Sequence, residues 1–153
     1  MWVATFAFLA AVMNNLVAHN LSAFYNGVLQ AVYAGLYISP TPAPTPGLIL
    51  SGITEANYQG YARQPVVWFP TFIDSAGPQD LAAQNMQFTP TGSATGNTIT
   101  GAFIATALTG GVLYLAATLP VPVALPSPGY ALDLSPVFQL SYQNNYGTPM
   151  PFA

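Results

Sequence analysis

The chain has 153 residues and a formal charge of −3, and only 3% of its residues are charged, where an ordinary soluble domain carries about 25%. A single cation, Arg63, cannot neutralise a run of phosphates, so the composition excludes nucleic-acid binding as a main activity and a polybasic membrane-surface site. The absence of cysteine excludes disulfides, thiolate nucleophiles and cysteine-built zinc sites.

The N-terminal stretch 1–13 is apolar except for Thr5 and stops at Asn14 and Asn15. It is shorter than the roughly 20 apolar residues that a membrane-spanning helix needs, and no lysine or arginine flanks it. Apolar residues at helical spacing continue to Val32. The pattern predicts one apolar N-terminal α-helix over about residues 2–34, within a first segment 1–34. A membrane-associated protein through residues 1–34 remains a less favoured alternative.

From Gly35 onward the pattern is that of extended chain. A proline-rich strap covers residues 39–47, and its alternating prolines favour a polyproline-like conformation. Short runs of strand-forming residues, separated by Gly, Pro, Asn and Asp, then recur about every ten residues. The predicted strands are 35–39, 48–53, 58–62, 65–69, 72–74, 86–89, 97–108, 112–117 and 132–142. This spacing predicts a mainly β protein, with an antiparallel β-sandwich or jelly-roll-like domain over 35–142, no helices after residue 40, and a C-terminal tail over 143–153.

Three local features add detail to this prediction. Gly110 and Gly111 favour a tight hairpin, because glycine accepts the positive φ of primed turns. The prolines between 120 and 128 predict an edge that cannot pair along its length. Strand 65–69 is apolar on both faces, so we expect it to be buried on two sides.

The weakly charged surface also indicates association. A freely diffusing monomer mixes charges of both signs over its surface, whereas the centres of permanent interfaces lose charge and gain aromatic residues. The chain has nine tyrosines and nine phenylalanines. We therefore interpret most of its outside as contact surface in an assembly.

A family resemblance rests on the segment 53–62, Ile-Thr-Glu-Ala-Asn-Tyr-Gln-Gly-Tyr-Ala, followed by Pro65, Val66 and Trp68. The segment resembles one found in a family of small virion proteins of tailed bacteriophages. The similarity includes the earlier pair Leu36-Tyr37 and the Pro/Thr linker. It continues through 88–92, 99–106, 113–116 and 128–132, and covers about residues 33–142.

The resemblance implies a capsid decoration or cement protein, a β-sandwich module on the capsid exterior that ties neighbouring major capsid protein subunits together. We also expect a homo-oligomer, with a trimer through the helix as one form. We expect aromatic anchors, the strap and both terminal segments at the contacts. The interface candidates are Trp2, Phe6, Leu9, Phe24, Pro40, Pro42, Pro44, Pro46, Tyr142, Tyr146 and Phe152.

A second class of function is a tail- or fibre-associated phage protein with a carbohydrate-binding β-sandwich. In it, Tyr58, Tyr61 and Trp68 would form a sugar-binding platform, although core packing is the favoured interpretation of these rings. A solvent-exposed lectin would still need ordinary surface charge, so the composition favours the cement protein.

Residues able to perform chemistry are few. Glu55 and Arg63, eight positions apart across a predicted turn, are expected to form a structural ion pair, with contact to a capsid partner as the alternative. His19 has no second histidine or cysteine with which to share a metal. Asp74 and Asp80 indicate a capped turn rather than a calcium site. We predict no catalytic residues, no metal ion and no cofactor, and expect that the protein is not an enzyme.

Overall fold

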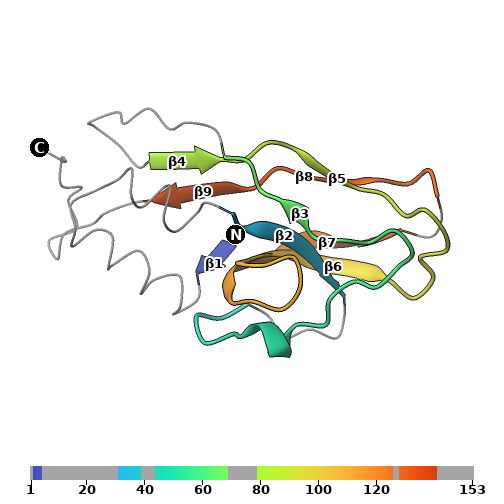
Figure 1. The fold of residues 1–153 in the computed structure, drawn as a ribbon, viewed down its shortest axis with the longest axis horizontal. Helices are drawn as coiled ribbons and strands as arrows, with labels where there is room; N and C mark the ends of the chain where they lie inside the picture. The colour runs from blue at the N-terminus through green and yellow to red at the C-terminus, as the bar shows by residue number, and fades with distance from the viewer. Residues whose placement is uncertain (1, 5–30, 39–43, 69–78, 126–127, 141–153) are drawn as a thin grey trace, which may run out of the picture.

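The computed structural model describes residues 2–4, 31–38, 44–68, 79–125 and 128–140 (Figure 1). These residues form nine β-strands and one short 3-10 turn, with no α-helix among them, and every strand pairing is antiparallel. The prediction of a mainly β, antiparallel protein is confirmed.

A five-stranded sheet forms the centre of the described structure, and two strand pairs accompany it. The sheet has the order β1 (Trp2–Ala4), β7 (Leu113–Ala124), β6 (Thr98–Ala105), β2 (Tyr33–Ile38) and β3 (Gln64–Pro65). The accompanying pairs are β4 (Gln79–Ala82) with β9 (Val137–Leu140), and β5 (Met86–Phe88) with β8 (Leu132–Leu134).

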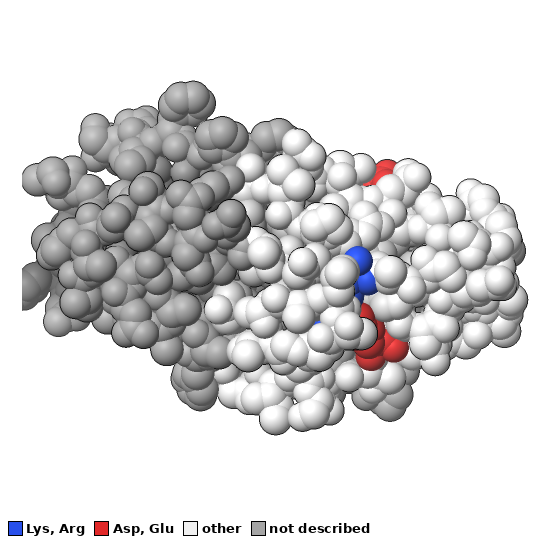
Figure 2. Space-filling view, viewed as in Figure 1, with Lys and Arg blue, Asp and Glu red and all other residues white. Residues whose placement is uncertain are grey.

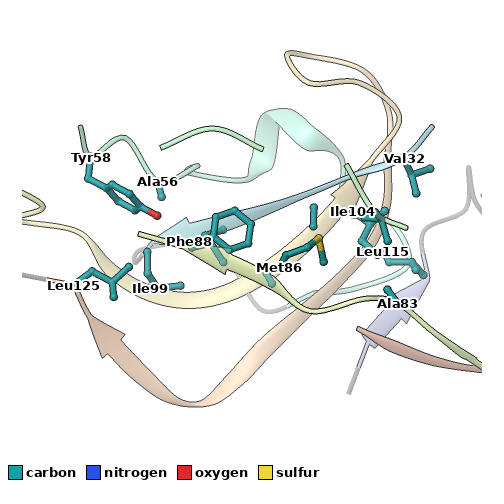
Figure 3. Packing of buried hydrophobic residues seen from close by; sticks show 14 of the residues in the cluster. Val32, Ala56, Tyr58, Ala83, Met86, Phe88, Ile99, Ile104, Leu115 and Leu125 are labelled. Atoms are coloured by element: carbon teal, nitrogen blue, oxygen red, sulfur yellow. The ribbon is translucent and has the colours of Figure 1, made fainter. Parts of the chain in front are cut away.

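Both faces of the five-stranded sheet are covered, which explains why β2 and β6 are buried almost continuously. Successive side chains of a strand point to opposite faces, so Leu36 and Ile104 lie in the main core cluster, while Tyr37 and Phe103 lie in a second one. Strand β5 packs on the first face through Met86 and Phe88, as Figure 3 shows. The second face is covered by three partly buried residues in and beside the 3-10 turn η1 (Leu50–Gly52), namely Leu48, Leu50 and Ile53.

The bounds predicted for the N-terminal helix are wrong at both ends. Residues Trp2–Ala4 form strand β1 on the edge of β7, and β2 already begins at Tyr33. The free edge of β7 offers backbone partners to any extended segment beside it, and this outweighs the helical spacing of the side chains. Residues 5–30, the rest of the predicted helix, lie outside the described residues. Within the described ranges, no helix has the length and apolar character needed to cross a membrane.

Two predicted strands in the first half have other conformations, and of the described residues of a third, 65–69, only Pro65 in β3 and Trp68, bridged to Ala83, pair as strand. Residues 48–53 contain η1, and residues 58–62 contain a turn closed by the Tyr61 N–H on the Tyr58 carbonyl. Of residues 65–69, Val66 and Trp68 are buried, but Val67 is 49% exposed, so the expected burial on two sides is wrong. The apolar composition of these segments predicts which residues are buried. Whether a buried residue lies in a strand depends on its backbone hydrogen bonds, which the composition does not predict.

The second half follows the prediction more closely. The positive φ of Gly110 and Gly111 is confirmed, although they lie in a wider loop, 106–112, whose base is closed by the Thr106 N–H on the Val112 carbonyl. Strand β7 continues through Pro120 and Pro122, but its pairing with β6 stops at Thr118 and resumes only at Val123, so this edge does not pair along its whole length, as predicted. A register shift between Ile99 and Gly101 accommodates the irregular ladder.

Candidate functional site

The chain's one cation is buried and paired. Arg63 is 6% exposed and lies just before β3, and Glu55 forms an isolated bridge with Tyr37 of β2. The Arg63 guanidinium donates from Nε to Glu55 Oε1 at 2.8 Å and from Nη2 to Glu55 Oε2 at 2.7 Å. This two-point geometry is the strong form of the arginine–carboxylate pair. The structure thus brings together the two residues predicted to form an ion pair.

The same guanidinium also holds the loop between β6 and β7. Its Nη1 donates to the Ala107 and Gly110 carbonyls, both at 2.7 Å, and its Cζ lies 5.0 Å from the ring centre of Phe103, a cation–π distance. The hydrogen bonds with Glu55 raise the pKa of Arg63 above its ordinary value. Arg63 is therefore a permanent charge whose donors join residue 55 to loop 106–112.

Tyr61 extends this network to the edge of β2. Its hydroxyl donates to Glu55 Oε1 at 2.8 Å and accepts the Leu36 N–H at 2.9 Å. Backbone bonds continue the closure, from the Ile38 N–H to the Thr54 carbonyl and from the Ala56 N–H to the Leu36 carbonyl. Segment 53–63 therefore covers the edge of β2 that β3 leaves unpaired beyond Ala34.

Phe103 fits between the sheet and the cation because the position opposite it is a glycine. Gly35 is the register partner of Phe103, and a Cβ placed at Gly35 would meet the Phe103 ring and lie 2.8 Å from the Tyr61 hydroxyl. The fully buried ring thus covers Gly35 on one side and contacts Arg63 on the other. We call Glu55, Tyr61, Arg63, Phe103 and the carbonyls of loop 106–112 the arginine network.

The geometry of the arginine network suits it for holding segments together. Glu55 accepts hydrogen bonds from Arg63 and Tyr61, and Arg63 donates to Glu55 and to two backbone carbonyls. Charge-assisted bonds of this kind, largely removed from water, fix the relative positions of the chain segments that supply them. In the described part of the chain, no three His, Cys, Asp or Glu residues are grouped so as to hold a metal ion.

The predicted interface residues are only partly described. Pro44 is half-buried, and Pro46 is exposed in a turn closed by the Leu48 N–H on the Thr45 carbonyl. Trp2 lies in β1. The remaining candidates fall outside the described residues, as do His19 and Asp74: Phe6, Leu9, Phe24, Pro40, Pro42, Tyr142, Tyr146 and Phe152.

The three aromatic residues considered for a sugar platform do not form an exposed one. Tyr58 is 5% and Trp68 7% exposed. Tyr61 meets Tyr58 edge to face with ring centres 5.3 Å apart, and stacks on Phe88 at 6.2 Å. These rings pack in or against the core, as the favoured interpretation expected, so any carbohydrate site would need other residues.

Sequence reasoning missed two features of this region. Phe103 and the carbonyls of Ala107 and Gly110 complete the arginine network, but a backbone carbonyl carries no residue signal, and only the Gly-Gly pair marked the loop. The second feature is a set of large apolar side chains on the outside of the described residues: Ile49, Val67, Leu108, Val112, Val121 and Tyr130.

Comparisons of the chain with protein-family models, with curated proteins and with solved structures return no match.

The two neighbouring tyrosines allow a matched test of the arginine network. Tyr61→Phe should lower the free energy of unfolding by about 1–2 kcal/mol, because the Leu36 N–H loses its acceptor and Glu55 loses a donor. The buried Tyr58 hydroxyl has no hydrogen-bond partner among the described residues, so Tyr58→Phe should be neutral or slightly stabilising. Urea unfolding of both variants measures the difference, and equal effects would contradict the network.

Stability should fall in alkali. Burial raises the pKa of Tyr58 to about 12 and also raises the pKa values of Tyr37 and Tyr61. Unfolded tyrosines ionise near pH 10, so above that pH the unfolded chain loses protons that the folded chain keeps. The stabilisation is complete below about pH 10 and declines by roughly 1.4 kcal/mol per pH unit for each such tyrosine. Urea unfolding at neutral and alkaline pH measures the slope, which should be smaller in Tyr58→Phe; an unchanged slope in that variant would contradict this account.

Proposed function

We propose that the chain is a structural virion protein, a cement or decoration protein that stabilises a phage head from the capsid exterior by bridging major capsid protein subunits. The observation that carries the proposal is the surface of the described residues. Large apolar side chains stand on it, among them Val121 at 70% and Ile49 at 65% exposed. In Figure 2 the described residues on this face are white apart from small patches of red and blue.

The described surface carries little charge. Among the charged residues whose side chains the structure describes, Arg63 is buried, Glu55 is paired with it, and Asp133 is exposed. A surface with so little charge and with exposed apolar and aromatic groups resembles the centre of a permanent interface, and a free monomer would associate through it. Such a surface suits a protein that is permanently bound to a capsid shell and to further copies of itself.

The fold supports the proposal in its finer form, a β-sandwich or jelly-roll-like module. The main core cluster takes residues from the five-stranded sheet and from β5, with side chains of β8 packed against it, and a β-sandwich would place its core in this way, between two β-layers. The resemblance of residues 53–62 to small phage virion proteins supports the same assignment. In this structure that segment closes the edge of β2, a feature that prevents unwanted strand pairing between copies.

No chemical step is needed for this function. Each copy would bury apolar and hydrogen-bonding surface across several capsid subunits, and many such contacts together resist the internal pressure of a filled head. The arginine network would contribute by keeping the module rigid without placing a free cation on the surface that binds the shell.

A co-sedimentation experiment tests the proposal. The full-length chain is mixed with assembled heads that lack it, from the phage whose genome encodes it, and the heads are pelleted. We expect saturable binding at a fixed number of copies per capsid subunit, and heads that withstand higher temperature once loaded. A chain that stays in the supernatant at all concentrations, while the heads remain intact, would overturn the proposal.

A further inference from the structure

The loop between β6 and β7 is held unusually firmly for an exposed loop. Its base is closed by two bonds to residue 106: the Thr106 N–H donates to the Val112 carbonyl at 3.0 Å, and the Val112 N–H donates to the Thr106 hydroxyl at 2.9 Å. The Arg63 guanidinium holds it from inside through the Ala107 and Gly110 carbonyls. The one cation of the chain is thus used to fix a loop.

What this loop presents to solvent is apolar. Leu108 is 53% and Val112 48% exposed, and the residues of loop 106–112 carry no charge. Single exposed apolar side chains are common on protein surfaces and need no explanation. Two on one fixed loop differ from this, because an ordered loop loses little conformational entropy when it binds.

We propose that loop 106–112 is a preorganised docking element that inserts Leu108 and Val112 into an uncharged apolar pocket of the major capsid protein. This inference rests on the proposed function and adds the surface through which it acts. The charge distribution selects the chemistry of the pocket. The Arg63 charge beneath the loop is buried and neutralised by Glu55, so a partner needs no carboxylate to match it and gains most from apolar contact.

The head-binding experiment with three single variants tests this inference. Leu108→Asp and Val112→Asp place a charge at exposed loop positions and leave the core intact, and each should weaken binding to the heads at least about tenfold. Ala124→Asp is the matched control, since Ala124 is exposed but lies at the end of β7, outside the loop and outside the set of large exposed apolar side chains. It should bind like the wild type.

The outcomes separate the inference from the proposed function. If the wild type binds and the loop variants bind equally well, the docking element is overturned and the proposed function stands. If Ala124→Asp loses as much affinity as the loop variants, binding is not specific to the loop and the inference is also overturned. If the wild type itself does not bind, both the docking element and the proposed function are overturned.

A further pair of variants tests preorganisation. Thr106→Ala removes the hydroxyl that accepts the Val112 N–H, yet alters neither apolar side chain. It should weaken binding by about threefold, through the added cost of ordering the loop, and Thr106→Ser should restore the affinity. Equal affinity in Thr106→Ala and the wild type would contradict the role assigned to the fixed loop.

Discussion

Replacing Arg63 with methionine is expected to lower the free energy of unfolding by about 3–5 kcal/mol, one of the two largest effects of a single substitution that we predict. Methionine has a similar length, so the loss arises from unpaired polar groups more than from a cavity. The variant leaves the Glu55 carboxylate without its counter-ion and the Ala107 and Gly110 carbonyls without their donor. Urea unfolding followed by circular dichroism measures the change.

A double variant distinguishes the ion pair from simple packing. In Arg63→Met the remaining carboxylate is the main liability, so adding Glu55→Gln should restore at least about 1 kcal/mol, because the amide oxygen can still accept from Tyr61. Asp133→Asn is the surface control, since Asp133 is exposed, and it should change stability by less than about 0.5 kcal/mol. An Arg63→Met protein as stable as the wild type would contradict the account of the arginine network.

Replacing Phe103 with alanine should cost nearly as much, about 3–5 kcal/mol. The ring is fully buried, covers Gly35 and lies beneath Arg63, so its removal opens a cavity between the sheet and the cation. Phe103→Leu should lose less, because it retains part of the volume over Gly35 but lacks the aromatic face that Arg63 contacts.

The control for Phe103 is another aromatic residue in a different environment. Tyr130 is 55% exposed, and Tyr130→Ala should change the free energy of unfolding by less than about 0.5 kcal/mol. The two substitutions remove rings of similar size, so their difference in urea unfolding reports burial. Similar losses in both variants would show that the core around Phe103 does not have the packing described.

The sequence predicts the β character of the second half well, because its strands obey simple rules. Strand β6 alternates its side chains between two covered faces, so its strand-forming residues locate it in the sequence. Gly110 and Gly111 have positive φ, so the glycine pair locates the loop that follows. In the first half of the chain the prediction fails where apolar residues occupy turns. Leu48, Leu50 and Ile53 pack partly buried against the cluster of Phe103 without joining a ladder, and period-two patterning cannot distinguish that from a strand.

The predicted site shows a similar division. Because the chain has so few charged residues, the pairing of Glu55 with Arg63 could be predicted from the sequence. The structure places the two side chains together. The partners that give the pair its role were not predictable. Two are backbone carbonyls more than forty residues away, and the third is the ring of Phe103, whose contact with Gly35 depends on the register of β2 on β6. Register is a tertiary property, fixed by pairing rather than by local sequence.

The proposed virion role is tested most directly by cryo-electron microscopy of phage particles produced from the genome that encodes the chain. We expect this chain in many ordered copies on the outside of the head, each contacting neighbouring major capsid protein subunits, with loop 106–112 at one of the contacts. Particles whose heads carry no copies, or in which a few copies occur only at the tail, would contradict the account.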